Sequence, residues 1–197
     1  MAGAMDSLEL VAREVAACTA CPLSAHRTHT VPGEGTAPAS LMLIGEGPGR
    51  QEDAEGRPFV GAAGQLLDRM LAAIHRDRTN VYIANVVKCR PPDNRTPSDD
   101  EALACAPFLS RQIALVDPDV IVTLGATATR LILGADVRIT RVRGQWHALG
   151  ERAVMPTFHP AFLLRDPRQK RLVWEDLQKV AARLGIPLAE GQGERGW

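Results

Sequence analysis

The chain has 197 residues, 45% of them hydrophobic, and its formal net charge is zero. This length and composition are typical of one globular domain with a sizeable core, and the net charge favours no partner. No apolar run approaches the roughly twenty residues of a membrane span, and no secretory signal is recognisable, so we expect a cytoplasmic protein in a reducing compartment.

The first half of the chain predicts two amphipathic helices and one buried strand. Asp6 or Ser7 can cap a helix whose apolar side chains are Leu8, Val11, Ala12 and Val15. The polar segment 24–40 is expected to be a loop. Residues 39–44 predict a buried strand, a Gly-rich stretch occupies residues 45–64, and residues 66–74 have the apolar periodicity of a helix.

The second half alternates strands with helices. Ser98 and Glu101 have the spacing of a capping box and predict a helix that runs to about Val116. The other predicted elements are strands at 81–87, 120–124 and 152–157, a short edge strand at 145–149, and helices at 126–133 and 167–184. We expect residues 1–5 and 189–197 to be flexible.

This alternation predicts an α/β fold, a single domain over residues 1–197 with a doubly wound, mainly parallel sheet. Ligands of such folds bind beyond the carboxyl ends of the strands. Residues 45–64, 88–97 and 159–165 follow three of the predicted strands, and Asn85 lies near the end of one. The unusual polar residues are therefore expected at one edge of the sheet.

The Gly-rich stretch has the strand–loop–helix context of an anion site, but its composition argues against phosphate. It contains four acidic residues, Glu46, Glu52, Asp53 and Glu55. Phe59 is its only large apolar residue. This side chain is either a plug that packs into the core or a platform for a flat ligand, and the sequence leaves both alternatives open.

Four cysteines are the complement that a tetrahedral metal site requires. Cys18 and Cys21 have the CxxC spacing, and Cys89 and Cys105 lie far from them in sequence. A shared metal site is favoured, although a disulfide pair or four unrelated core cysteines remain alternatives. The spacing does not separate zinc from an iron–sulfur cluster, and it leans slightly toward the cluster.

Basic residues are concentrated between positions 138 and 171, where only Glu151 and Asp166 are acidic. The asymmetry fits one basic face for nucleic acid, or a solvated surface without such a role. The basic residues of this segment are Arg138, Arg141, Arg143, Arg152, Arg165, Arg168, Lys170 and Arg171.

Four motifs together resemble the family 4 uracil-DNA glycosylases, from about Cys18 to Lys179. They are Gly-Glu-Gly-Pro-Gly at 45–49, Arg-Pro-Phe-Val-Gly at 57–61, Asn-Val-Val-Lys-Cys-Arg-Pro-Pro at 85–92 and His-Pro-Ala-Phe-Leu-Leu at 159–164. The resemblance implies a three-layer α/β/α domain around a four-stranded parallel sheet. It also implies a structural [4Fe-4S] cluster on the four cysteines and removal of uracil from DNA, which leaves an abasic site.

The resemblance also implies roles in binding a flipped-out uracil. Phe59 is expected to stack on the base, since stacking contributes about 1–3 kcal/mol per base. Asn85 is expected to read the uracil edge with its amide and to refuse cytosine. His159 and the backbone N–H near Gly47 are expected to stabilise the negative charge that develops near O2 of the leaving base.

The water-activating Asp of family 1 enzymes is absent, since Gly47 stands at its position. We expect Glu52 to position water or stabilise the cation-like sugar, with Glu46 as second choice. Leu163 matches the leucine that family 1 enzymes insert into the duplex, although it can simply begin the last helix. Arg165, Arg168, Lys170 and Arg171 are expected to bind phosphates beside it.

A relative of this family traps DNA covalently through a His in a loop after the second strand. Residues 90–97 contain no His, so we expect a monofunctional enzyme that turns over. The expected partner is uracil-containing DNA, single- or double-stranded, and the expected form is a monomer. Two rival functions are a non-catalytic nucleic-acid-binding module and a small electron carrier, and neither needs the set of Phe59, Asn85 and His159.

Overall fold

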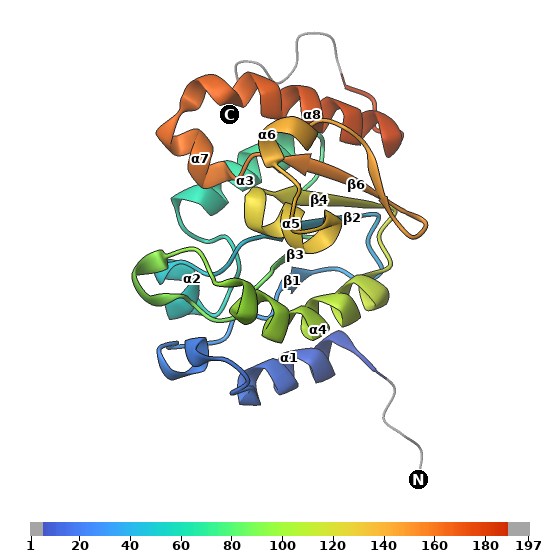
Figure 1. Cartoon of the computed structure of the whole chain (residues 1–197). Helices are drawn as coiled ribbons and strands as arrows, with labels where there is room; N and C mark the ends of the chain where they lie inside the picture. Colours follow the sequence, from blue (N-terminus) through green and yellow to red (C-terminus); the bar gives the residue numbers. More distant parts are fainter. Residues whose placement is uncertain (1–5, 189–197) are drawn as a thin grey trace.

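The computed structural model describes residues 6–188, so the two ends expected to be flexible lie outside the described residues. A six-stranded sheet in the order β1-β3-β2-β4-β6-β5 lies between two layers of helices (Figure 1). The strands are β1 (Glu34–Gly35), β2 (Leu41–Gly45), β3 (Tyr82–Asn85), β4 (Val120–Leu124), β5 (His147–Leu149) and β6 (Arg152–Thr157).

The four central strands are parallel, as expected, and the two edge strands, β1 and β5, are antiparallel to their neighbours. The expected count of four strands is therefore too small. The strand at β5 follows from the apolar segment 145–149, whereas β1 consists of two residues in the polar segment 24–40 and carries no strand pattern.

Eight α-helices lie among the described residues. They are α1 (Leu8–Ala17), α2 (Arg50–Glu55), α3 (Ala62–Ala73), α4 (Asp99–Val116), α5 (Ala126–Leu133), α6 (Ile139–Val142), α7 (Pro160–Arg165) and α8 (Lys170–Arg183). Short 3₁₀ turns occupy Pro22–Ala25, Pro92–Asn94 and Pro167–Gln169. None of the described helices has the length and apolar character needed to cross a membrane.

Both faces of the sheet are covered, which explains why β2 and β4 are buried along their whole length. Leu41 and Leu43 point to the face that packs against α3 and α8. Met42 and Ile44 point to the opposite face, which packs against α4 and α5. This two-sided burial follows from the period of two in side-chain direction along a strand.

Helix α1 forms an additional layer outside α4, seen at the bottom of Figure 1. Arg111 of α4 forms ion pairs with Asp6 and Glu14, which tie the two helices together. The predicted caps are present. Ser7 Oγ accepts a hydrogen bond from Leu10 N at 3.1 Å, and Ser98 forms the reciprocal capping box with Glu101.

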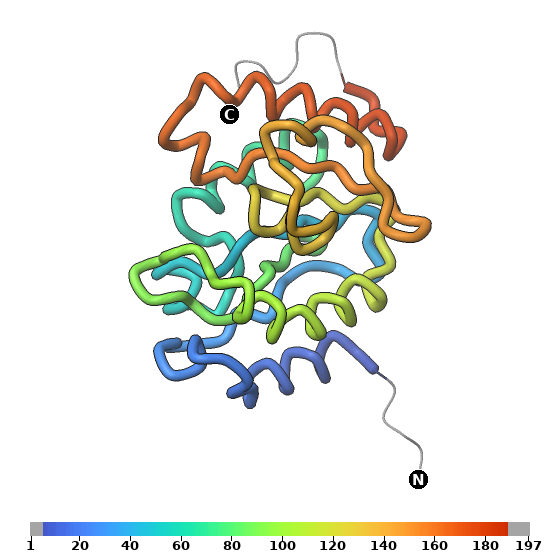
Figure 2. Tube along the Cα trace, in the orientation of Figure 1, coloured from blue at the N-terminus to red at the C-terminus, as the bar shows by residue number. Residues whose placement is uncertain are grey.

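Three chain segments meet at the carboxyl ends of the parallel strands. They are the segment after β2, the loop after β3 and the segment after β6, all on the left of Figure 2. The Gly-rich stretch is not one loop, because α2 lies within it. Likewise, the segment after β6 is not a loop but α7, a short helix separate from α8.

Candidate active site

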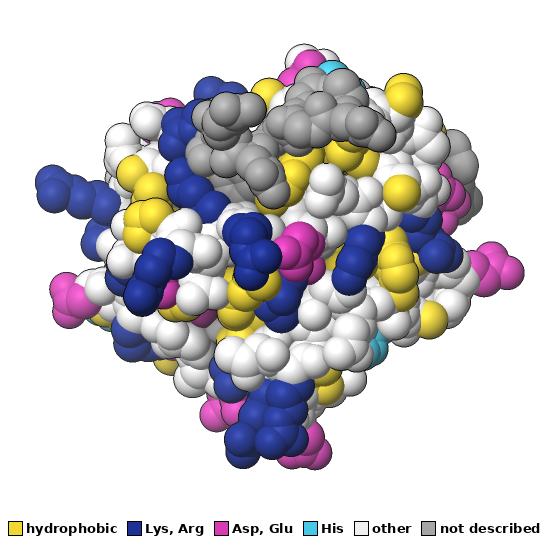
Figure 3. All heavy atoms as spheres, turned by 90° about the horizontal axis from the view of Figure 1, so that it is seen from above, with side chains coloured by type: hydrophobic (Ala, Val, Ile, Leu, Met, Phe, Trp, Pro, Cys, Tyr) yellow, Lys and Arg dark blue, Asp and Glu magenta, His cyan; other side chains and the backbone are white. Residues whose placement is uncertain are grey.

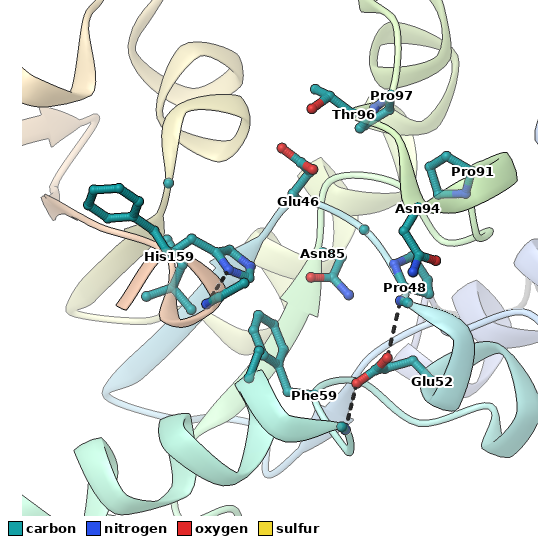
Figure 4. A pocket seen from close by; sticks show the side chains of 18 of the residues that line it. Glu46, Pro48, Glu52, Phe59, Asn85, Pro91, Asn94, Thr96, Pro97 and His159 are labelled. Carbon is teal, nitrogen blue, oxygen red and sulfur yellow. Dashed lines mark hydrogen bonds between the residues drawn. The ribbon is translucent and has the colours of Figure 1, made fainter. Parts of the chain in front are cut away.

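A cleft of about 850 Å³ opens where these three segments meet. Figure 4 shows its floor and walls, with Asn85 between Glu46, Phe59 and His159. Residues 91–97 line the opposite side, and the start of α5 completes the wall. The position agrees with the expectation that ligands of α/β sheets bind beyond the carboxyl ends of the strands.

Asn85 lies at the floor of the cleft as the last residue of β3. Its side chain is 1% exposed, and its Oδ1 atom has no hydrogen-bond partner among residues 6–188. A buried amide oxygen without a partner costs about 1–3 kcal/mol. The amide is therefore held ready for a ligand that donates an N–H group.

Gly45 makes room for this amide and for the ring beside it. The register of β2 and β3 places Gly45 opposite Asn85. A Cβ atom at Gly45 would lie 2.5 Å from Asn85 Oδ1 and 2.4 Å from Phe59 Cζ. No larger residue fits here without moving both side chains of the cleft floor.

Phe59 packs into the core and also faces the cleft, so both positions that the sequence left open for its side chain are occupied. Its side chain is 5% exposed and packs in the core that α3 and α8 cover, and its ring also lines the cleft. The ring stacks near the His159 imidazole, with centroids 5.5 Å apart. Arg78 fixes the segment, because its guanidinium donates to the carbonyl oxygens of Pro58 and Phe59.

Phe59 also has a φ of 54°, in the left-handed region that a large aromatic residue rarely adopts. Such a conformation costs on the order of 1–3 kcal/mol and persists where surrounding contacts enforce it. The two hydrogen bonds from Arg78 are contacts of that kind. The ring is thus held at the cleft by the backbone as well as by packing.

His159 presents one defined ring nitrogen to the cleft. It caps α7, where its Nδ1 accepts a hydrogen bond from Ala161 N at 3.1 Å. Burial and, to a smaller extent, the positive charge of Arg165 lower the pKa of His159 to about 4, against the opposing negative charge of Glu52. The imidazole is therefore neutral near pH 7, and the hydrogen bond to Nδ1 assigns the ring proton to Nε2.

The two candidate glutamates differ in what their oxygens already bind. Glu52 Oε1 accepts from Val60 N at 2.9 Å and Gly61 N at 2.8 Å, and its Oε2 accepts from Gly49 N at 3.1 Å. Figure 4 shows Glu52 turned toward these backbone groups. Glu52 thus joins α2 to the segment before α3 and stabilises the wall of the cleft.

Glu46 lines the cleft with fewer bonds to the protein. Its Oε2 accepts a hydrogen bond from Thr127 Oγ1 at 2.5 Å, and Thr127 lies in the first turn of α5. Figure 4 shows the Glu46 carboxylate above Asn85. The following residue, Gly47, also lines the cleft, and a Cβ atom there would lie 2.7 Å from Val87 Cγ2.

The expectation that Leu163 is an exposed wedge is wrong. Its side chain is fully buried, because this side of α7 packs against the core beside α3. The next residue, Leu164, is 45% exposed and is one of two large exposed hydrophobic side chains among residues 6–188. The motif 159–164 contains two adjacent leucines, and only the helical turn of α7 distinguishes them.

Two residues of the basic segment bind acidic side chains of the fold. Arg143 binds the buried Asp176 and Leu172 O and is therefore structural, whereas Arg152 forms an ion pair with the exposed Asp117. Lys and Arg side chains are spread over the face in Figure 3, with acidic side chains between them. Arg165 is exposed and lines the cleft.

The three other basic residues assigned to DNA follow Arg165 outside the cleft. Arg168 pairs with Asp166 at 2.8 Å, and Arg171 pairs with Glu175 at 3.5 Å. Lys170 begins α8 and is half-buried. Ion pairs at such exposed sites contribute about 0–1 kcal/mol, so Arg168 and Arg171 can exchange their partners for phosphates at small cost.

The four cysteines converge on a second, small cavity on the α1–α4 side of the sheet, although they come from three separate segments. Arg27 Nη1 donates to Cys89 Sγ at 3.2 Å, and Ala20 N approaches Cys18 Sγ at 3.5 Å. Burial raises the pKa of Cys105 to about 11, and the nearby positive charge of Lys88 opposes this rise.

The donors around this cavity fit an anionic iron–sulfur cluster. Arg27 and Lys88 also line it, and within the described part of the chain neither has a carboxylate partner. In the same residues, no three Cys, His, Asp or Glu side chains converge on a single metal ion. Four cysteine sulfurs are the ligand set of a [4Fe-4S] cluster, and these four line one cavity.

Sequence reasoning missed three residues that support the site: Arg78, Thr127 and Lys88. Arg78 and Thr127 have no motif around them, and only the fold brings them to Phe59 and Glu46. Lys88 stands inside the motif 85–92, but its burial was not foreseen. Its position directly before Cys89, a candidate metal ligand, was the signal in the sequence that could have indicated its role.

The fold and site define a three-layer α/β protein whose cleft is lined by an aromatic ring, a buried amide and an imidazole. The chain belongs to the uracil DNA glycosylase superfamily, whose family model matches residues 32–178. It is 51% identical over 181 residues to the type-4 uracil-DNA glycosylase of Thermotoga maritima. The aligned region covers 89% of this chain and 93% of that relative.

Similarity extends to archaeal relatives. The type-4 uracil-DNA glycosylase of Sulfurisphaera tokodaii is 48% identical over 89% of this chain and 84% of its own length. The enzyme of the same type from Archaeoglobus fulgidus is 41% identical over 92% of this chain and 95% of its own length.

Proposed function

We propose that this chain is a DNA repair glycosylase that flips uracil out of DNA and hydrolyses its N-glycosidic bond. The observation that carries the proposal is Asn85, a buried amide with an unsatisfied oxygen at the floor of a cleft. The type-4 uracil-DNA glycosylases to which the chain is 41–51% identical support it.

Asn85 distinguishes uracil from cytosine by the direction of two hydrogen bonds. Uracil presents a donor at N3 and an acceptor at O4, whereas cytosine presents an acceptor and a donor. The Asn85 Oδ1 atom accepts from N3–H and its Nδ2 donates to O4. A site built to pair with one such pattern rejects the reversed pattern strongly, because buried polar groups then remain unpaired.

Phe59 supplies the surface on which the flipped base stacks. Its ring is held against the core and cannot turn away from the cleft without breaking the contacts described above. Extruding a base costs a few kcal/mol of lost pairing and stacking, and stacking on an aromatic ring returns about 1–3 kcal/mol of it.

His159 stabilises the leaving base. Bond cleavage places negative charge near O2 of uracil, and the neutral His159 donates a hydrogen bond to it from Nε2. The Gly47 N–H is the second donor. A neutral donor suits this step, since its hydrogen bond strengthens as charge develops in the transition state. The removal of one such donor costs on the order of 10²–10³-fold in rate.

Glu46 is the carboxylate that positions water and stabilises the cation-like sugar. This reverses the order expected from the sequence, which favoured Glu52. Both Glu52 oxygens already accept backbone hydrogen bonds, whereas Glu46 faces the cleft with a single bond from Thr127. Glu52 acts by fixing the loop that carries Gly49 and Gly61.

Leu164 enters the duplex at the position that the flipped nucleotide leaves, and Arg165 contacts the adjacent phosphate. Arg168, Lys170 and Arg171 bind phosphates further along the strand. An exposed leucine on a helical turn, followed directly by Arg165, has the residue types of an intercalating wedge. The substrate is uracil-containing DNA, single- or double-stranded, and the enzyme acts as a monomer.

Cys18, Cys21, Cys89 and Cys105 hold a [4Fe-4S] cluster, which supplies structural cross-linking and no step of the reaction. The cluster joins the segment after α1, the loop after β3 and α4. Arg27 supports this site with hydrogen bonds to Cys89 Sγ, Cys18 O and Ala16 O. The enzyme is monofunctional and releases its product, because residues 90–97 provide no His to trap the sugar.

The test is alkali-sensitive strand cleavage of an oligonucleotide that contains one uracil, with a thymine oligonucleotide as the control substrate. We expect cleavage only at uracil. Asn85→Ala and His159→Ala are each expected to lose excision by about 10²-fold or more while they keep the wild-type thermal transition. Near-wild-type excision by both variants would contradict the site, and no cleavage by the wild type would contradict the function.

A further inference from the structure

Lys88 is a buried ammonium group that the proposed reaction does not use. Its side chain is 1% exposed and lies between the cleft and the cysteine cavity. The Nζ atom donates to Asn85 O at 2.7 Å and to Gln112 Oε1 at 2.6 Å. One side chain therefore contacts the backbone of the base-reading residue and lines the cavity of the four cysteines.

Among the residues that the structure describes, the charge of Lys88 has no anionic partner. Both of its acceptors are neutral amide oxygens, and no carboxylate in residues 6–188 pairs with it. A buried, unpaired charge is costly and is normally compensated. The titratable group that favours the charged form of Lys88 is Cys105, one of the four cysteines.

The network around Lys88 connects the cysteines to the sheet. Cys89 is the next residue in the chain, and Gln112 lies on α4 two turns after Cys105. Gln112 Nε2 also donates to Pro32 O at 2.6 Å and to Tyr82 Oη at 3.2 Å, and Tyr82 is on β3. One hydrogen-bonded network therefore links Lys88, next to Cys89, and α4, which carries Cys105, to the strand that carries Asn85.

We propose that Lys88 is a positioning residue that couples the cluster to the uracil pocket: its ammonium group balances the negative charge of the cluster and holds the backbone of Asn85. The inference rests on the proposed function. It adds that the cluster supports base recognition through the side chain of Lys88. Loss of the cluster leaves Lys88 uncompensated and loosens the Asn85 carbonyl.

Three variants test this coupling. Lys88→Met removes the charge and keeps an unbranched side chain, whereas Lys88→Arg keeps the charge and the N–H donors. Lys179→Met is the matched control, since Lys179 Nζ also donates to a backbone carbonyl, Gly144 O at 2.7 Å, but lies on α8 across the sheet from the cysteines.

Three measurements on the purified full chain are compared. They are the rate at which a chelator bleaches the visible absorption of the cluster, the reduction potential of the cluster, and the affinity for DNA that contains uncleavable 2′-fluoro-2′-deoxyuridine. We expect Lys88→Met to bleach faster and to have a more negative potential, because a nearby positive charge stabilises the reduced cluster. Its affinity for the analogue DNA should fall about tenfold or more, with unchanged affinity for thymine DNA.

Lys88→Arg is expected to retain most of the wild-type behaviour, and Lys179→Met all of it. Wild-type bleaching, potential and affinity in Lys88→Met would overturn the proposal, and so would equal losses in Lys88→Met and Lys179→Met. If Lys88→Met has no cooperative thermal transition, Lys88→Gln replaces it under the same criteria. A wild type without iron or excision activity contradicts the proposed function itself, whereas an active, iron-containing wild type beside an unaffected Lys88→Met contradicts only the role of Lys88.

Discussion

Single side chains in the cleft have their roles set by the hydrogen bonds they already make. The two glutamates are alike in sequence, since both stand in the acidic, Gly-rich stretch. The structure separates them, because Glu52 accepts hydrogen bonds from three backbone N–H groups, whereas Glu46 accepts one bond from Thr127. This distinction leads to opposite expectations for the two residues.

Glu46→Gln and Glu52→Gln should therefore differ in kind. Glu46→Gln keeps the fold and lowers kcat by about 10²-fold, because the carboxylate acts on the sugar and water. Glu52→Gln loses at least one backbone hydrogen bond and about 1–2 kcal/mol of stability. Single-turnover excision and thermal unfolding of both variants separate these effects. A Glu46→Gln enzyme as active as wild type would exclude Glu46 from catalysis.

The lowered pKa of His159 makes stability depend on pH. An unfolded His titrates near pH 6.5, whereas the pKa of folded His159 is about 4 because of its burial. Between these values the unfolded chain binds a proton that the folded chain does not, so the free energy of unfolding falls as pH drops from 6.5 to 4.

This contribution should disappear in His159→Gln, whose unfolding free energy varies less across the same window. Thermal unfolding of wild type and variant at several pH values measures the difference, and the other histidines cancel in it. Parallel pH dependences for the two proteins would show that His159 is not buried as a neutral group.

At the level of elements, the regular parts of the fold were predictable and the irregular parts were not. The bounds of β4, α5 and β6 agree with the predicted ones, because buried apolar strands and Gly boundaries give a local signal. Helix α2 has no such signal. Five of its six residues, Arg50–Glu55, are polar, and Gly49 and Glu52 hold its first turn.

The candidate site was predicted in part for the same reason. Asn85, Phe59 and His159 stand in motifs, so the sequence indicated them. Whether Leu163 or Leu164 faces solvent depends on the rotation of α7 against the core, which sequence spacing does not define. Likewise, the sequence does not indicate that the buried Asp176 binds Arg143 and takes it out of any DNA surface.

The close approach of β2 to β3 at the cleft floor gives an element-level prediction. Gly45→Ala places a methyl group within about 2.5 Å of Phe59 and Asn85, so both side chains must shift. We expect excision to fall by about 10²-fold or more, since shifts of about 1 Å in a catalytic arrangement cost that much. Gly134→Ala is the control, because a Cβ atom at Gly134 meets no atom within 4 Å.

Both variants need a far-UV circular dichroism spectrum and a thermal transition beside the excision rate. Gly134 has a positive φ, so its substitution has a backbone cost of its own but no clash. Equal excision rates for Gly45→Ala and wild type would mean that the floor of the cleft is not as tightly packed as described.

At the scale of the whole molecule, two sites lie on the two sides of one strand end. The cleft uses Asn85 at the end of β3, and the cysteine cavity begins four residues later at Cys89. The cavity unites α4 with the segment after α1, so a cluster there would fasten the outermost helical layer to the sheet. From this arrangement we expect the content of the proposed cluster to affect stability as well as pocket geometry.

Removal of the cluster by a chelator under reducing conditions should lower the thermal transition by several degrees or more. Loss of a bound group destabilises the folded state by the free energy of its binding. Differential scanning calorimetry before and after removal measures the change, with iron content determined on the same samples. An unchanged transition after complete loss of iron would contradict a structural cluster.

The central claim is that the chain turns over on uracil in DNA, and the release of free uracil measures this most directly. Mass spectrometry can count free uracil after incubation with an excess of uracil-containing DNA, with denaturing electrophoresis of the protein alongside. We expect many uracil molecules per protein chain, none with Asn85→Ala at the same times, and no protein shifted onto DNA. No free uracil, or uracil released once per chain with a permanent protein–DNA adduct, would contradict the account.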